Sequence, residues 1–363
     1  MNNTCLDPWF WFDDNPDLDC VLYCRLRFYR SLSGELFPHR CSNEDLGKIQ
    51  NKIIPILNGL IDKELLCITS EHQEDCLISV QEVFDESDLS SLQPGQALVL
   101  GKNGRLFLIN KKSHVVLSRI GPGLLALDTF QELLALDQNL DAELTWACSE
   151  NYGFLNPEPI HTGSGLECTA LLFMPGTIES GMFERAVKDL LSQGFEVSVF
   201  KGEQADEDSS RRDTSFPLVQ LYYAVPHGIT EQEGLEGIRN ALNGLMKGER
   251  ATRERLVQKR SDEILDTANR AYGILTNAHL MTRDECRQLL LDLRKGLVYN
   301  CITFQEHHGI LKNIDRLWFS TEALVRQYMK VVPEHQITDN YIKSLRAKLV
   351  RNVLSQYHID RGI

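Results

Sequence analysis

Alternating apolar and polar positions open the patterned part of the chain. Residues 20–30 (CVLYCRLRFYR) repeat with a period of two, which is typical of a β-strand. In a strand, Arg25 and Arg27 share one face, while Leu26 and Phe28 share the other. The pattern therefore predicts a strand with one basic face, which is interpreted either as an exposed face or as one side of a binding site.

Short apolar runs with helical stretches between them fill the first two-thirds of the chain. Strands are predicted at 64–69, 77–80, 97–100, 105–109, 114–118, 167–174, 196–200 and 218–225. Helices are predicted at 43–62, 123–138 and 180–193, with a hairpin turn at 101–104 and a polar loop at 202–215.

After about residue 230 the apolar spacing is helical only, including the terminal stretch 341–354. Thr282 and Glu285 have the spacing of a capping box, which predicts a helix start. The chain of 363 residues is long enough for two domains. We expect an α+β domain at 20–245 and an all-α domain at 246–363, preceded by an extension at 1–19.

Composition excludes several classes of function. The net charge of −13 argues against nucleic acid or an anionic membrane as the main partner. No stretch of 18 apolar residues exists, and the acidic, aromatic N-terminus does not resemble a signal peptide, so we expect a cytoplasmic protein. The ten cysteines form no Cys-x-x-Cys pair, and the His307-His308 pair lacks nearby ligands, so no metal site is expected.

The main candidate for chemistry is the stretch 153–176. Gly163-Ser164-Gly165 has the composition of a loop that lets backbone approach a phosphate. Two carboxylates, Glu158 and Glu167, lie close to it in sequence and oppose anion binding. The alternative is that the two glycines only allow a tight turn.

Together these segments resemble the phosphagen kinase family of ATP:guanido phosphotransferases, and most closely its bacterial protein-arginine kinases. Residues 23–31 are similar to the motif S-S-R-I-R-L-A-R-N, and 153–169 align without a gap on G-Y-L-T-S-C-P-T-N-x-G-T-G-L-R-A-S. Further similarities are GFEVSVFKGEQ, LVQLYYAVPHGITEQE, GERATRE, RAYGILTNAH, LLLDLRKGL and RAKLVR. The resemblance implies a glutamine-synthetase-like antiparallel sheet flanked by helices, followed by a helical domain that recognises phosphoarginine.

The resemblance also implies a nucleotide site for ATP and Mg²⁺. Its positions here are Arg25, Leu26, Arg27, Gly163, Gly165, Glu167, Cys168, Thr169, Ser198, Gly202 and Glu203. Family arginines are replaced at Glu167 and Ser198, and Glu158 stands where the family has a reactive cysteine. Each charge-assisted hydrogen bond contributes about 1.5–3 kcal/mol, so these replacements remove most of the phosphate affinity.

The family's catalytic glutamate loop, N-E-E-D-H-x-R, has two registers in this chain. We prefer residues 106–118, which keep Asn110 and His114 at the right distance from the glycine loop. In that register Lys112 occupies the catalytic glutamate position, and the loop's arginine is Val116. The alternative register, 72–76, supplies Glu74 but lies too early in the chain.

The helical domain departs from the family pattern as well. The R-D-x-x-R-A motif tied to phosphoarginine falls on residues 342–347, which keep Arg346 and Ala347 but lose the leading Arg-Asp pair. Arg294 and Arg346 remain as donors to an anion. They are our candidates for phosphoarginine binding.

Three hypotheses follow. The first is a pseudokinase with no cofactor that regulates protein quality control by binding proteins, such as a zinc-containing activator or a Clp-type protease, either alone or as a homodimer. The second is an active protein-arginine kinase using ATP and Mg²⁺. In it Arg25, Arg27 and Arg30, together with Lys112 or Lys201, bind the nucleotide, and a carboxylate such as Glu203 or Glu74 orients the substrate. The third, a kinase of a small guanidino metabolite, is disfavoured by the C-terminal helices.

Overall fold

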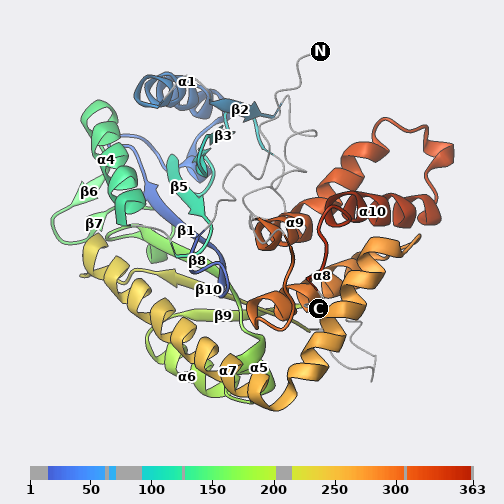
Figure 1. Ribbon diagram of the computed structural model, residues 1–363. Coiled ribbons are helices and arrows are strands. Elements are labelled where there is room, and N and C mark those ends of the chain that lie inside the picture. The colour runs from blue at the N-terminus through green and yellow to red at the C-terminus, as the bar shows by residue number, and fades with distance from the viewer. Residues whose placement is uncertain are drawn as a thin grey trace, which may run out of the picture.

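A computed structural model describes residues 15–61, 65–70, 92–124, 127–201, 215–305 and 309–360. Eight strands form one sheet in the order β2-β3-β4-β5-β1-β8-β10-β9, and every neighbouring pair is antiparallel (Figure 1). In that order they are Leu66–Thr69, Ala97–Gly101, Arg105–Ile109, Val115–Gly121, Val21–Arg30, Leu166–Phe173, Ser215–Ala224 and Glu196–Lys201. The predicted antiparallel sheet is confirmed; the run 77–80 lies outside the described residues.

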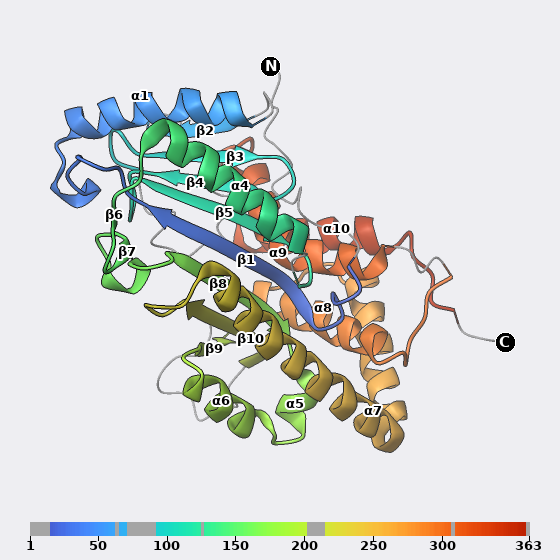
Figure 2. The same cartoon turned by 90° about the vertical axis from the view of Figure 1, so that its left-hand side faces the viewer.

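Helices cover one face of the sheet, as Figure 2 shows. They are α1 (Asn43–Leu60), α4 (Leu127–Leu144), α6 (Phe183–Ser192) and the first half of α7 (Glu231–Asn277). Their apolar stripes pack with Cys24, Leu26 and Phe28 of β1 in a single core. Alternation within the strand therefore directs Cys24, Leu26 and Phe28 of β1 toward the helices and leaves Arg25 and Arg27 on the other face.

The C-terminal helices pack on one end of that second face. After α7 come α8 (Arg283–Val298), α9 (Ile310–Met329) and α10 (Asp339–Leu354), and they share a core with Tyr23, Phe173 and Phe216 of the sheet. Thr282 and Glu285 form the predicted capping box at the start of α8. The helical end of the chain is confirmed.

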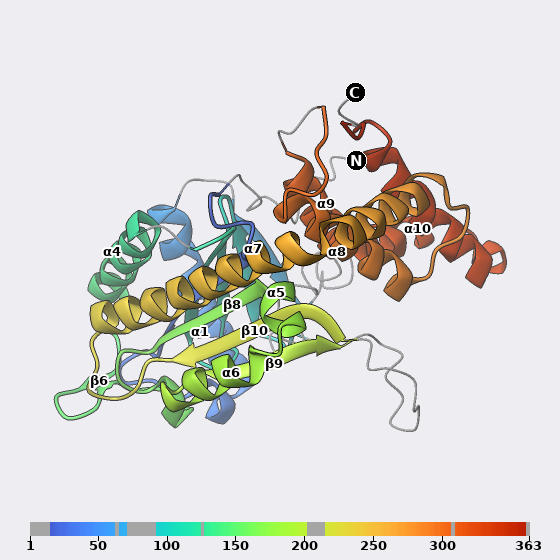
Figure 3. The same ribbon diagram turned by 60° about the horizontal axis from the view of Figure 1, so that its bottom comes forward.

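Helix α7 links the sheet to the C-terminal helices, as Figure 3 shows. It passes through the expected boundary near residue 245 and has a non-helical residue at Arg260. Buried Glu249 of α7 accepts hydrogen bonds from the backbone N–H groups of Gly176 and Thr177 at the start of α5 (Pro175–Glu179). The domain boundary itself remains a prediction.

The smaller elements complete the chain. They are β6 (Cys148–Ser149), β7 (Gly153–Phe154) and three 3-10 turns, Pro38–Arg40, Pro159–His161 and Glu334–Gln336. No described helix has both the length and the apolar character needed to cross a bilayer.

Candidate functional site

Two arginines of β1, Arg25 and Arg27, lie on the sheet face opposite the helices α1, α4 and α6, here called the arginine face. Strand register places Arg27 opposite Glu167 and Arg25 opposite Thr169 on β8. Tyr222 of β10 pairs with Thr169 on the far side. Three neighbouring strands thus bring together, on one face, residues that are distant in sequence.

Glu167 sits at the centre of this group. Tyr29 Oη donates to Glu167 Oε2 over 2.6 Å, and Tyr222 Oη donates to the same oxygen over 3.2 Å. His161 Nε2 lies 3.1 Å from Oε2, and Arg27 Nη1 lies 3.5 Å from Oε1. The His161 ring stacks on Tyr29 with 3.6 Å between centroids. The carboxylate is therefore held by donors on two sides.

The charge state of Glu167 follows from these contacts. Burial alone would raise the pKa of Glu167, but the hydrogen bond from His161 and the charges of Arg27 and Arg25 outweigh it and hold the pKa well below its ordinary value of 4.5. Burial, followed by the charge of Glu167, raises the pKa of Tyr222. Glu167 is an anion at neutral pH and offsets positive charge on the arginine face.

Two expectations about β1 and β8 require correction. Arg25 and Arg27 are each 1% exposed, so they do not form an exposed basic strand face. Leu26 and Cys168 were expected beside the nucleotide, but their side chains point into the helix-covered core, where Cys168 Sγ lies 3.5 Å from Cys24 Sγ. The physical reason is the two-residue period of a strand, which sends them to the opposite face.

The glycine loop packs against β1. Gly163 and Gly165 have φ angles of 108° and 63°, and a Cβ on Gly165 would lie 2.6 Å from Arg30 Nη1. The Gly165 carbonyl accepts from the Tyr29 N–H, and the Ser164 carbonyl accepts from Arg30 Nη1. These contacts account for both glycines without a phosphate and support the tight-turn interpretation.

The sequence did not predict a buried ion pair, between Arg30 and Asp137, that lies beside the glycine loop. Arg30 donates through Nε and Nη2 to Asp137 of α4 at 2.9 and 2.7 Å, and Arg30 is 0% exposed. Trp146 Nε1 donates to the same carboxylate. Sequence reasoning also missed Tyr29, His161 and Tyr222; only Tyr29 had a usable signal, because it continues the alternation of Arg25 and Arg27.

The loop at 110–114 connects β4 and β5. Ser113 Oγ donates to Asn156 Oδ1 over 2.8 Å, and Asn156 Nδ2 donates to the carbonyls of Tyr29 and His161. These bonds tie the loop, in which Lys112 is half-buried, to the segment that carries the glycines. The loop that contains Lys112 is therefore tied, through Ser113 and Asn156, to the Tyr29 end of β1, and the catalytic role of the Lys112 position remains a prediction.

In that register His114 occupies the position of the histidine in the family motif. Its ring hydrogen-bonds to the backbone. Its Nδ1 accepts from the Leu32 N–H over 3.0 Å, and its Nε2 lies 3.0 Å from the Leu36 carbonyl, which fixes the neutral tautomer. Burial lowers the pKa of His114 from 6.5 to about 4, although the bond to Leu36 opposes the shift.

The buried His114 predicts a pH dependence of stability. A histidine with a depressed pKa stabilises the fold above its unfolded pKa, and this contribution is lost as pH falls from about 6.5 to about 4. We expect wild type to lose about 3 kcal/mol more unfolding free energy than His114→Gln over this range, measured by urea unfolding. His39→Gln, at an exposed position, serves as control and should follow wild type. Parallel curves for wild type and His114→Gln would contradict the prediction.

The remaining candidates are dispersed. Ser198 of β9 pairs with Gln220 on β10, on the arginine face, and two strands, β8 and β10, lie between it and β1. Glu158 Oε2 lies 3.1 Å from His161 Nδ1. Several predicted positions lie outside the described residues, namely Glu74, the alternative register 72–76, Gly202, Glu203 and the His307-His308 pair.

The two phosphoarginine candidates are engaged within the chain. Arg294 is fully buried, pairs with Asp315 at 2.7 Å and donates to the carbonyls of Leu18 and Asp19. Arg346 donates through Nε and Nη2 to both oxygens of Glu322. Their guanidinium groups serve helix packing, and a role in phosphoarginine binding remains a prediction.

The described residues around Glu167 pair with one another without a phosphate. Arg27 faces a buried carboxylate, and the Tyr29 and Tyr222 hydroxyls donate hydrogen bonds to that carboxylate. No group of three or more His, Cys, Asp or Glu among the described residues is arranged to hold a metal ion. The arrangement stabilises a buried carboxylate.

Two protein-family models match this chain, one over most of the α+β part and one over the helical end. The model of the ATP:guanido phosphotransferase C-terminal catalytic domain matches residues 53–252, and that of the protein-arginine kinase McsB C-terminal domain matches residues 261–361. The protein-arginine kinase of Shouchella clausii (strain KSM-K16) is 25% identical over 360 residues, covering 97% of this chain and 96% of the relative. That of Bacillus cereus (strain AH820) is 23% identical over 333 residues, covering 90% of each.

Solved structures share the fold. Lombricine kinase superposes with a TM-score of 0.52 at 18% identity, covering 65% of this chain and 67% of its own. The duplicated taurocyamine kinase from Schistosoma mansoni gives a TM-score of 0.53 at 16% identity, covering 89% of this chain and 49% of its own. At these identities the likeness is one of fold alone.

Proposed function

Because the chain belongs to the ATP:guanido phosphotransferase family, we propose that it is a catalytically silent relative of the protein-arginine kinases that acts by binding other proteins. The observation that carries the proposal is Glu167, which stands where the family motif has an arginine and is ion-paired to Arg27. An internal carboxylate thus takes the charge that a nucleotide phosphate would need.

Two further observations support the proposal. The preferred catalytic-loop register has Lys112 at the glutamate position, and a cation there repels a guanidinium substrate instead of orienting it. Arg294 and Arg346 are paired with Asp315 and Glu322. The partners in this proposal are those expected from the resemblance, a zinc-containing activator or a Clp-type protease in the cytoplasm.

A phosphorylation assay tests the proposal. Purified full-length chain, incubated with Mg²⁺, γ-labelled ATP and an arginine-rich protein, is expected to transfer no acid-labile label above background. The protein-arginine kinase of Bacillus cereus, assayed in parallel, provides the positive control. Magnesium-dependent labelling of arginine by the wild-type chain would refute the proposal.

Calorimetry with Mg-ADP tests whether the charge of Glu167 is what prevents nucleotide binding. Wild type should show no saturable binding, whereas Glu167→Gln, which keeps the shape and removes the charge, should gain about tenfold or more in affinity. Asp189→Asn, at an exposed position of α6, changes the net charge by the same amount and should bind as wild type does. Equal affinities of wild type and Glu167→Gln would show that Glu167 is not what excludes the phosphate.

A further inference from the structure

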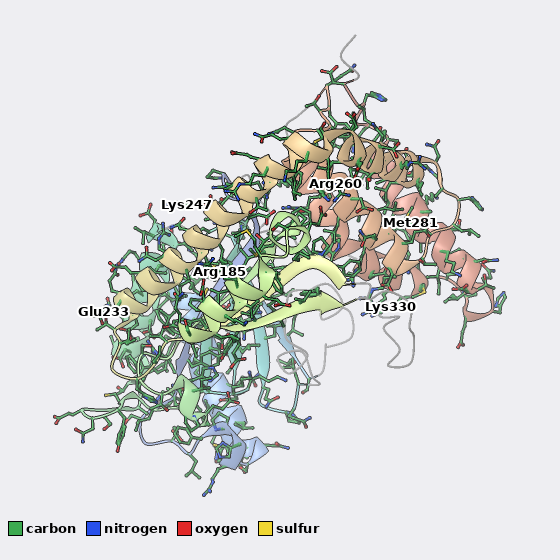
Figure 4. All side chains as sticks on the ribbon, turned by 90° about the horizontal axis from the view of Figure 1, so that it is seen from below. Arg185, Glu233, Lys247, Arg260, Met281 and Lys330 are labelled. Carbon is green, nitrogen blue, oxygen red and sulfur yellow. The ribbon has the colours of Figure 1, made fainter. Side chains whose placement is uncertain are left out.

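A groove of about 390 Å³ lies between α6 and the first half of α7, on the helix-covered side of the sheet. Figure 4 shows α6, with Arg185 labelled, lying alongside the part of α7 that carries Glu233 and Lys247. The apolar lining of the groove consists of Met174, Met182, Ala186, Leu190, Ala241 and Leu245. Met182 is 45% exposed, so the groove opens to solvent.

Two glycines leave the α7 wall of the groove open. A Cβ added to Gly244 or Gly248 would meet no atom within 4 Å, whereas one added to Gly234 would lie 2.5 Å from Val225 Cγ2. Packing within the chain therefore requires glycine at 234 but not at 244 or 248, although interior glycines destabilise a helix relative to alanine. Bare backbone at these two positions allows another helix to approach α7 closely.

The shape of the groove determines what kind of element can fill it. Its α7 wall extends from Asn240 to Thr252, about 18 Å along the helix axis, which is the length of about three helical turns. A two-fold contact between copies would set one hollow against the same hollow of the other copy, because both contribute the same patch. A single helix is convex, and it can pack against α6 and α7 together as the third helix of a small bundle.

Helix α6 gives the groove a direction. The Met182 N–H at the start of α6 donates to the Thr177 carbonyl, and the Thr177 N–H donates to Glu249 of α7. From there α6 runs back toward the first turn of α7, as Figure 3 shows. The two helices are therefore antiparallel, and Arg185 lies nearer than Asp189 to the end of the groove where α6 starts.

Charges of opposite sign lie toward the two ends of the groove. Exposed Arg185 lines it near the start of α6, and exposed Arg255 lies beyond that end, on the same side of α7 as the two groove glycines. Asp189 lines the groove one turn further along α6, and exposed Glu233 lies beyond the opposite end. Among the described residues, no ion pair joins Arg185, Asp189 or Arg255 to another side chain. These rim charges can therefore pair with a bound partner.

We propose that the groove binds an amphipathic helix of a partner protein, with acidic residues in its first turn, basic residues in its last turn and apolar residues facing the groove between them. Such a helix lies parallel to α6. Its first turn then meets Arg185 and Arg255, and its last turn meets Asp189 and Glu233. This distribution of charge also suits the dipole of the bound helix. The inference rests on the proposed binding function and deepens it by naming the chemistry of the partner.

A selection of displayed peptides tests the groove. A phage library of helical peptides of about four turns is selected on wild type and depleted on Gly244→Leu, whose added side chain occupies the groove. Enriched sequences should carry apolar residues at helical spacing, acidic residues first and basic residues last. The synthetic consensus peptide, measured by fluorescence polarisation, should bind Gly244→Leu about tenfold or more weakly than wild type. Gly273→Leu, at an open position of α7 outside the groove, is the matched control and should bind as wild type does.

Charge reversal tests the direction in which the bound helix lies. Arg185→Glu and Arg255→Glu should each raise the dissociation constant of the consensus peptide by about threefold or more, because a carboxylate then faces the acidic first turn. A peptide with its acidic and basic ends exchanged should show the reverse order and bind the double variant more tightly than wild type. Lys188→Glu, at an exposed position of α6 outside the groove lining, changes the charge equally and should leave binding unchanged.

Three outcomes would overturn the proposal. They are a library from which wild type enriches no helical sequence, a consensus peptide that binds wild type and folded Gly244→Leu equally, and a Gly244→Leu variant whose own sedimentation differs from wild type, which would assign the groove to a second copy. Circular dichroism checks that each variant keeps its fold. The arginine-labelling assay reports on the silence of the chain alone, so a silent chain that binds no peptide refutes only the groove, and a labelling chain that binds peptide refutes only the silence.

Discussion

Replacing Glu167 by alanine is expected to lower the free energy of unfolding by about 3–5 kcal/mol, because removing one partner of a buried pair leaves Arg27 uncompensated. The Tyr29 hydroxyl, which donates to the carboxylate over 2.6 Å, loses its acceptor as well. Urea unfolding at neutral pH measures the change. Glu196→Ala, at an exposed position of β9, is the control and should change stability by less than about 0.5 kcal/mol.

Two extensions separate charge from packing at this position. The double variant Arg27→Met/Glu167→Leu should recover most of the loss, since a hydrophobic pair replaces a buried ion pair at little cost. Because the pKa of Glu167 is depressed, its stabilising contribution is present above the unfolded value of 4.5 and is lost as pH falls into the acid range. A Glu167→Ala variant with the unfolding free energy of wild type would show that the carboxylate of Glu167 does not stabilise buried Arg27.

Replacing Asp137 by alanine should cost about 3–5 kcal/mol, because Arg30 then has no buried carboxylate against its Nε and Nη2. The expected loss is measured by urea unfolding beside Glu132→Ala on the same helix. Glu132 is 55% exposed and lies 3.6 Å from Arg105 and Arg119, so its removal should cost less than about 1 kcal/mol. Similar losses in both variants would contradict the distinction between buried and exposed pairs.

The sequence predicted the helices and strands well, because periodicity and capping depend on residues that are close together in the chain. The two-residue alternation around Arg25 and Arg27 gave β1, the Thr282 capping box gave the start of α8, and the stripe at 180–193 gave α6. The family motifs also identified Glu167 as the residue that reverses the expected charge. Each of these signals depends on neighbours within a few turns or strand residues.

Contacts between distant segments decided the rest. No window of sequence indicates that Arg30 meets Asp137, that Tyr222 reaches Glu167, or that His161 stacks on Tyr29. Of the two interpretations of Arg25 and Arg27, the exposed face is wrong for the same reason, since burial depends on what packs over a strand.

The amino-acid sequence by itself therefore determined the strands, the helical end, the family with its antiparallel sheet, and the sign of the charge at position 167. The tertiary structure alone decided that this charge is buried against Arg27 and that α6 and α7 leave a groove. The physical reason is that periodicity and capping act over a few residues, whereas the burial and pairing of charges depend on strands and helices brought together from distant parts of the chain.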